Sequence, residues 1–177
     1  MMQYTQQYFE AQKLEMKHFH ETQIWIDYFN PKKVLDIGCG MGHRVFVFRE
    51  NEIESYGFDL QDAINYVPYN PEWFKVGNID SIPFEEKFDL VLVYDVLEHL
   101  EIDLDIALKE IKRISSGHII FSIPFYGDPN LFNDKTHKLF KTREWWFYKI
   151  GKYFKIIETP KHFPFHQQMI ICRNKDE

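Results

Sequence analysis

The feature that most restricts the fold of this chain is an apolar run followed at once by three alternating glycines. Residues 34–37 read Val-Leu-Asp-Ile, and glycines occupy positions 38, 40 and 42. The run predicts a buried strand, and glycine tolerates the positive φ values of a tight turn. A helical pattern follows, so the segment predicts a strand, a turn and a helix start. Open α/β sheets bind ligands at such a turn, against the N–H groups of the helix.

A second apolar run, residues 53–58, ends in Asp59, about 20 residues after Gly38. An acidic residue at this spacing, at the tip of the second strand, is placed to accept hydrogen bonds from ribose hydroxyls. The combination therefore predicts a nucleotide-like ligand. Position 43 is histidine where the dinucleotide fingerprint has its third glycine, and this weakens the case for a pyrophosphate-binding turn.

The rest of the chain alternates strand-like and helix-like segments, which predicts a parallel sheet with right-handed crossovers. The run at residues 88–94 is almost continuously apolar, as is typical of a central strand covered on both faces. The last two runs are too close together for a crossover helix, so they must form an antiparallel hairpin. The predicted strands are residues 34–37, 53–58, 73–76, 88–94, 118–123, 153–158 and 167–172.

Helical periodicity is clearest in residues 103–114, where every inward position is apolar. Residues 3–29 predict a helix in two pieces that ends at Pro31, with Thr22, Trp25, Ile26 and Phe29 on one face. Residues 124–141 predict a long irregular loop, and such loops in compact domains are usually functional or disordered. The other predicted helices are residues 43–51, 61–66 and 142–150.

Four motifs in register resemble a known family. They are VLDIGCGMG at residues 34–42, YGFDL at residues 56–60, and the segments 77–84 and 88–100. In order and spacing they resemble the class I S-adenosylmethionine-dependent methyltransferases, and in particular those that act on small molecules. The resemblance implies a Rossmann-like α/β fold. Its seven-stranded sheet is mostly parallel with an antiparallel last strand, and helices cover both faces.

The resemblance also implies how the chain is organised. Residues 1–177 are expected to form a single methyltransferase domain that binds S-adenosylmethionine. Residues 1–30 would form a helical lid, in which Tyr4 and Tyr8 either line the lid or pack the helix on the sheet. Residues 124–141 would lie on the acceptor side.

By the same resemblance, three acids recognise different parts of the cofactor. Asp36 is suited to its amino end, Asp59 to its ribose hydroxyls, and Asp80 to its adenine amino group. Beyond the fourth strand, Tyr94 and Asp95 are expected to face the sulfonium. The predicted cofactor-binding residues are Asp36, Gly38, Cys39, Gly40, Gly42, Asp59, Leu60, Asn78, Ile79, Asp80, Tyr94 and Asp95.

Methyl transfer needs a base only when the acceptor must lose a proton early, and imidazole titrates near neutral pH. We therefore predict His99, His137 and Glu98 as catalytic residues. His162 and His166 are weaker candidates.

A turn that holds Asp95, Glu98 and His99, joined by His137, would also suit a divalent cation. It is similar to the ExxEH segment of metal-dependent relatives, but the same segment occurs in metal-free ones, and no metal is predicted.

Composition limits the partners. The net charge of −6 argues against broad nucleic-acid binding, although residues 135–143 could form a local basic patch. Two cysteines suggest a reducing compartment, and with no apolar run of membrane-spanning length we expect a cytoplasmic protein.

The predicted function is O-methylation of a small polar acceptor, such as a sugar or lipid-linked metabolite. The alternatives are an RNA methyltransferase, possibly a metal-dependent one, and a non-catalytic S-adenosylmethionine-binding protein. The sequence leaves the oligomeric state open.

Overall fold

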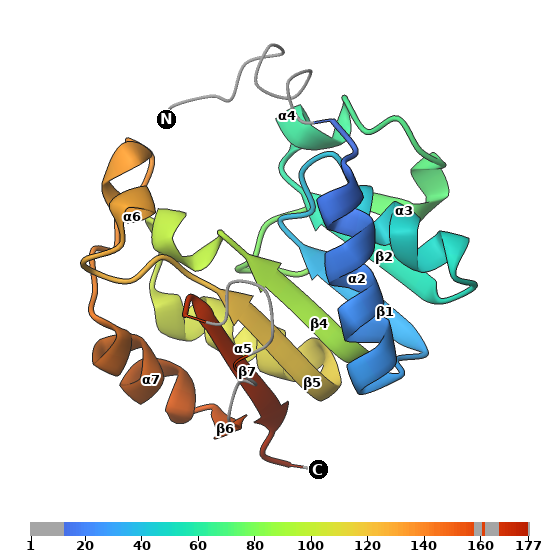
Figure 1. Ribbon diagram of the computed structural model, residues 1–177. Coiled ribbons are helices and arrows are strands. Elements are labelled where there is room, and N and C mark those ends of the chain that lie inside the picture. Colours follow the sequence, from blue (N-terminus) through green and yellow to red (C-terminus); the bar gives the residue numbers. More distant parts are fainter. Residues whose placement is uncertain (1–12, 158–160, 162–166, 177) are drawn as a thin grey trace.

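The computed structural model describes residues 13–157, 161 and 167–176, without the side chains of Asn130 and Asn133. Its strands form one seven-stranded sheet in the order β3-β2-β1-β4-β5-β7-β6 (Figure 1). Adjacent strands among β1 to β5 are parallel, and β7 is antiparallel to both β5 and β6. The strands are β1 (Lys33–Ile37), β2 (Glu54–Asp59), β3 (Phe74–Val76), β4 (Phe88–Tyr94), β5 (Ser115–Ser122), β6 (Phe154–Ile157) and β7 (Met169–Asn174). The predicted fold, including its final antiparallel hairpin, is confirmed.

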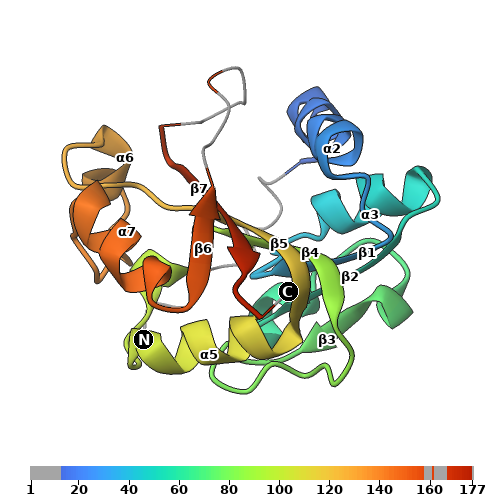
Figure 2. The ribbon, with the colours of Figure 1, turned by 90° about the horizontal axis from the view of Figure 1, so that it is seen from below.

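Helices cover both faces of the sheet, because strand residues alternate between two apolar layers (Figure 2). On one face, α2 (Met16–Phe29) and α3 (His43–Glu50) contribute Trp25 and Phe48 to the layer built on Leu90 and Leu92. On the other face, α5 (Leu104–Ile114) and α7 (Arg143–Gly151) pack against the layer that contains Val91 and Val93. Because both faces are covered, β4 is buried along most of its length, as its apolar run predicted.

The amphipathic pattern of α5 is fully realised. The side chain of Asp103 accepts a hydrogen bond from Asp105 N and caps the helix, and Lys112 and Arg113 lie in its last turn. The predicted inward residues are all buried: Leu104, Ala107, Leu108, Ile111 and Ile114.

The structure differs from the prediction in the loop at residues 124–141. This segment is not wholly irregular, because α6 (Pro129–Asn133) forms inside it. The first described helix begins at Met16, and residues 13–15 before it are not helical, although the prediction included them in a helix. Residues 3–12 of the predicted helix, with Tyr4 and Tyr8, lie outside the described residues, as do His162 and His166. The short elements are α4 (Gln61–Ile64), η1 (Pro71–Trp73) and η2 (Leu97–His99).

Within the described part of the chain, no helix combines the length and apolar character needed to cross a lipid bilayer.

Candidate active site

The glycine turn joins β1 to α3 in the conformation that its sequence predicts. Gly38, Gly40 and Gly42 have φ values of 70°, 52° and 72°. The N–H groups of Gly38 and Cys39 both donate to Phe58 O on β2, which ties the turn to the neighbouring strand. A Cβ atom on Gly38 would lie 2.4 Å from Val96 Cγ2. A side chain would therefore strain the backbone and also clash with the segment that follows β4.

A cavity of about 360 Å³ opens at the carboxyl ends of β1, β2 and β4, within the size range of small-molecule sites. Its wall includes most of the residues predicted to bind the cofactor, together with one of the predicted catalytic residues. These are Gly38, Cys39, Gly40, Asp59, Leu60, Asn78, Ile79, Tyr94, Asp95 and His99.

The other predicted residues lie around the cavity without lining it. Asp36 is buried beneath the turn, and Gly42 is the N-cap residue of α3. Asp80 is exposed in the small turn that the bridge between Asn78 and Ser81 closes. Glu98 and His137 are buried beside His99 and complete the predicted set.

Asp59 is held in position by the backbone. Its Oδ2 accepts from Gly40 N at 2.8 Å, and its Oδ1 accepts from Leu60 N at 2.7 Å. A carboxylate oxygen has more than one acceptor site, so each oxygen can still accept from a ribose hydroxyl. Burial raises the pKa of Asp59, and the two backbone hydrogen bonds oppose that shift. The strand tip therefore presents an oriented acceptor to the cavity.

His99 lies on the opposite part of the wall, at the end of η2, and is oriented by a short chain of hydrogen bonds. Its Nδ1 lies 2.8 Å from Thr136 Oγ1, and that hydroxyl donates to Asp134 Oδ1 at 2.6 Å. Because the hydroxyl proton is used on Asp134, the hydroxyl oxygen accepts from the Nδ1–H of His99. Nε2 of His99 is then the nitrogen with a lone pair.

Glu98, His99 and His137 form one cluster whose potential ligand atoms lie within 4.8 Å of one another. His137 Nδ1 lies 2.7 Å from Leu131 O, a carbonyl that can only accept, so His137 presents Nε2 to Glu98 Oε1 at 3.9 Å. Glu98 is fully buried, and neither of its carboxyl oxygens has a hydrogen-bond partner among the described residues. Burial, and then the charge of Asp95, raise the pKa of Glu98 well above its usual value.

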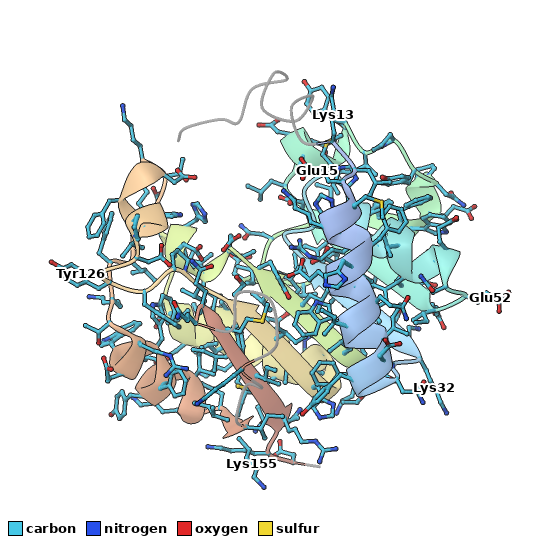
Figure 3. All side chains as sticks on the ribbon, in the orientation of Figure 1. Lys13, Glu15, Lys32, Glu52, Tyr126 and Lys155 are labelled. Carbon is cyan, nitrogen blue, oxygen red and sulfur yellow. The ribbon has the colours of Figure 1, made fainter. Side chains whose placement is uncertain are left out.

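The segment 124–141 is attached to this cluster through its backbone. Lys138 N and Leu139 N both donate to Glu98 O, at 2.7 and 3.0 Å. The segment also exposes three aromatic rings, and the ring of Phe132 on α6 contacts those of Tyr126 and Phe140. In Figure 3, Tyr126 points outward at the left edge of the molecule, away from Glu15, which precedes α2. The segment thus connects the surface to His99.

A family model described as a methyltransferase domain matches residues 8–166, nearly the whole chain. The chain belongs to this methyltransferase family. It is also 30% identical, over 100 residues, to the mitochondrial ubiquinone biosynthesis O-methyltransferase of Candida albicans. That match covers 50% of this chain and 31% of the relative, so the chain spans about a third of that protein's length.

The fold of this chain is similar to those of solved methyltransferase structures. The N-methyltransferase NodS from Bradyrhizobium japonicum WM9, in complex with S-adenosylhomocysteine, is 16% identical with a TM-score of 0.66, over 94% of this chain and 88% of that one. An S-adenosylmethionine-dependent methyltransferase from Archaeoglobus fulgidus is 20% identical with a TM-score of 0.66, over 93% and 96%. The methyltransferase is of class I, and its cofactor is S-adenosylmethionine.

Asp36 of the methyltransferase is placed for an electrostatic role. Burial raises the pKa of its carboxyl to about 7, although the nearby Arg44 guanidinium acts in the opposite direction. Neither carboxyl oxygen has a hydrogen-bond partner among the described residues. A cation in the cavity above the turn would favour the ionised carboxylate.

Sequence reasoning missed several residues of the site. Arg44, Val96 and Leu100 line the cavity, and Thr136 orients His99. Arg44 could have been suspected from its position just after the glycine turn. Thr136 gave no usable signal, because it meets His99 only through the tertiary fold.

Proposed function

We propose that this methyltransferase transfers the methyl group of S-adenosylmethionine to a hydroxyl of a small polar acceptor, such as a sugar or a lipid-linked metabolite, with His99 as the general base. The observation that carries the proposal is the orientation of His99. Its Nδ1 is occupied by Thr136, and the ring lines the cavity, so Nε2 is available to an acceptor. Burial and the adjacent His137 lower the pKa of His99, so its imidazole is neutral near pH 7.

The chemistry is a single displacement. Bound S-adenosylmethionine would supply an activated methyl group: the acceptor oxygen would form a bond to the methyl carbon as the carbon–sulfur bond breaks, and S-adenosylhomocysteine would leave with the electron pair on sulfur. The hydroxyl proton passes to His99 Nε2. The sulfonium is already activated, so most of the rate comes from alignment of oxygen, methyl and sulfur, and the base adds a smaller factor.

Other features support a small oxygen acceptor. The relative from Candida albicans is named an O-methyltransferase. The α2 end of the proposed lid, residues 1–30, and the acceptor-side segment 124–141 would close the pocket above the cofactor. Both cysteines are free and buried, which supports the proposal of a reducing, cytoplasmic location.

The test is transfer of a labelled methyl group to a panel of hydroxyl, amine and RNA acceptors, with wild type, His99→Gln and a control variant. His118→Gln is the control, because His118 lies on β5 against Phe29 and does not line the cavity. We expect oxygen-linked product, a loss of about 100-fold or more in kcat for His99→Gln, and unchanged affinity for S-adenosylhomocysteine. Label on nitrogen or RNA alone, or full activity of His99→Gln, would contradict the proposal. Binding without any transfer would favour a non-catalytic protein.

A second candidate function is metal-assisted methylation, including that of RNA. It is favoured by the buried carboxyl of Glu98, whose oxygens have no hydrogen-bond partner among the described residues and which lies beside two imidazoles. Glu98, His99 and His137 offer the oxygen and nitrogen ligands that many divalent cations accept. Such an ion would polarise the acceptor oxygen, and it would occupy the nitrogen that the first proposal assigns to proton transfer.

Chelation separates the two candidates in the same assay. If His99 is the base, a chelator leaves turnover unchanged. Lost turnover that manganese or magnesium restores, together with calorimetric binding of manganese that Glu98→Gln abolishes, would support the metal-assisted reaction and reject the general-base role.

A further inference from the structure

Arg44 is the only Lys or Arg among the described residues that line the cavity. It is the second residue of α3, directly after the glycine turn. Its guanidinium carbon lies 4.0 Å from the centroid of the Tyr94 ring, and its Nη2 donates to Glu21 Oε2 on α2 at 3.2 Å. The group is therefore fixed from two sides, by a ring at the end of β4 and by a carboxylate from the covering helix.

Among the described residues, a hydrogen-bond acceptor is found for one nitrogen of Arg44, Nη2. A guanidinium has five N–H donors in a planar fork that matches a carboxylate. Nη2 bonds Glu21, whereas Nε is buried without a hydrogen-bond partner among the described residues. A buried donor left unsatisfied is costly, so the arrangement calls for an acceptor at the site.

The surroundings of Arg44 are acidic, and they decide which part of the cofactor belongs there. Glu21, Asp36 and Asp95 all contribute to its electrostatic environment. The methionine end of the cofactor carries an ammonium group and a carboxylate. The ammonium group of the cofactor is attracted by the three acids. The carboxylate of the cofactor is repelled by them, and the positive charge of Arg44 can offset this repulsion.

The position of Arg44 in the wall agrees with this assignment. Asp59, Leu60 and Ile79 form the part of the wall expected to receive ribose and adenine. Arg44 and Tyr94 belong to the part between the glycine turn and the end of β4, where the methionine end must then lie.

We propose that Arg44 binds the carboxylate of the cofactor's methionine moiety, and that Glu21 and Tyr94 are positioning residues for its guanidinium. The inference concerns the cofactor and does not depend on the identity of the acceptor. It also gives α2 a role in cofactor binding, because Glu21 on α2 holds the guanidinium of Arg44, which lines the cavity.

The test compares two ligands by calorimetric titration: S-adenosylhomocysteine, and its decarboxylated analogue, which keeps the amino group. Arg44→Met removes the guanidinium and keeps an unbranched apolar side chain at this position. A double variant, Glu21→Gln with Arg44→Met, removes the unpaired buried charge that the single change leaves. Arg49→Met is the matched control on the same helix, because Arg49 donates to Ser55 O and does not line the cavity.

We expect wild type to bind S-adenosylhomocysteine at least tenfold more tightly than the analogue. Both Arg44 variants should lose at least tenfold in affinity for S-adenosylhomocysteine and less than twofold for the analogue, while Arg49→Met changes neither. Equal losses for the two ligands would mean general damage to the cavity and would overturn the assignment, as would unchanged affinity in a folded variant. If neither Arg44 variant folds, equal binding of the two ligands by wild type overturns it.

Discussion

Two carboxyl groups at the ends of neighbouring strands are prepared for different tasks by their surroundings. Asp59, at the tip of β2, has its two oxygens oriented by N–H groups of Gly40 and Leu60 and faces the cavity. Asp36, in β1, is only 1% exposed, and the described part of the chain offers it no such donors. One is a preformed acceptor. The other is a buried carboxyl whose ionised form is destabilised by its burial.

At the residue scale, Asp36 should therefore make stability depend on pH. Its pKa is about 7 in the folded state, against 3.8 for an ordinary aspartate, so the folded state binds the proton more tightly. Stability from this group is greatest below the lower value, falls as pH rises towards 7, and is constant above. At about 1.4 kcal/mol per pKa unit, Asp36→Asn should stabilise the apo protein by roughly 2–4 kcal/mol at pH 8 and by less at pH 5. Cofactor affinity should fall.

Chemical denaturation of wild type and Asp36→Asn at the two pH values measures this difference. Asp80→Asn, at an exposed acid, serves as the control and should show no comparable change between pH 5 and pH 8. A gain that is the same at both pH values, or a destabilised Asp36→Asn, would show that burial is not the dominant influence on this carboxyl.

Residues differ in how far sequence could assign them. Asp59 could be predicted as a ribose-binding residue because that proposed role depends on spacing along the chain, and the structure places the residue in the cavity wall. The adenine role of Asp80 stays a prediction, since its side chain is exposed and outside that wall. Arg44 and Thr136 were missed as site residues because their roles come from Tyr94, Glu21 and His99, which meet them only in the folded state.

At the scale of elements, the spacing of apolar residues along the sequence predicted helices and strands correctly where one or both faces of the segment are buried. The inward face of α5 and the continuous apolar run of β4 follow from their sequences. The short α6 was not predicted, because a helix of one or two turns has too little periodicity to detect. Strand ends shifted by one to three residues, because the sheet register and not local propensity sets them.

Two elements should respond to the cofactor more than the rest. The first half of α2 carries Glu21, which pairs with Arg44 in the cavity wall, and residues 124–141 are hydrogen-bonded to the segment before His99. We expect hydrogen exchange at residues 16–22 and 124–141 to slow when S-adenosylhomocysteine binds, while the strands β5 and β7 show little change. Protection confined to residues 38–80 would contradict the proposed lid.

At the scale of the whole molecule, the site follows from topology. The chain runs outward from β1 to β2 and β3, then returns to place β4 on the other side of β1. The crossovers on the two sides of β1 leave a crevice at the carboxyl ends of β1 and β4, where open α/β sheets bind their ligands. Strand and helix alternation predicted this architecture. The hydrogen bonds from residues 138 and 139 to Glu98 could not be predicted, since they depend on how a loop folds back.

The central claim is that this crevice holds S-adenosylmethionine with its ribose on Asp59. The most direct measurement is calorimetric titration of S-adenosylhomocysteine into wild type, Asp59→Ala and Asp62→Ala, the last being an acid on α4 that does not line the cavity. Loss of hydrogen bonds to a charged acceptor costs about 1.5–3 kcal/mol, so Asp59→Ala should bind at least tenfold more weakly. Asp62→Ala should match wild type. Equal affinity of folded Asp59→Ala and wild type would contradict the account.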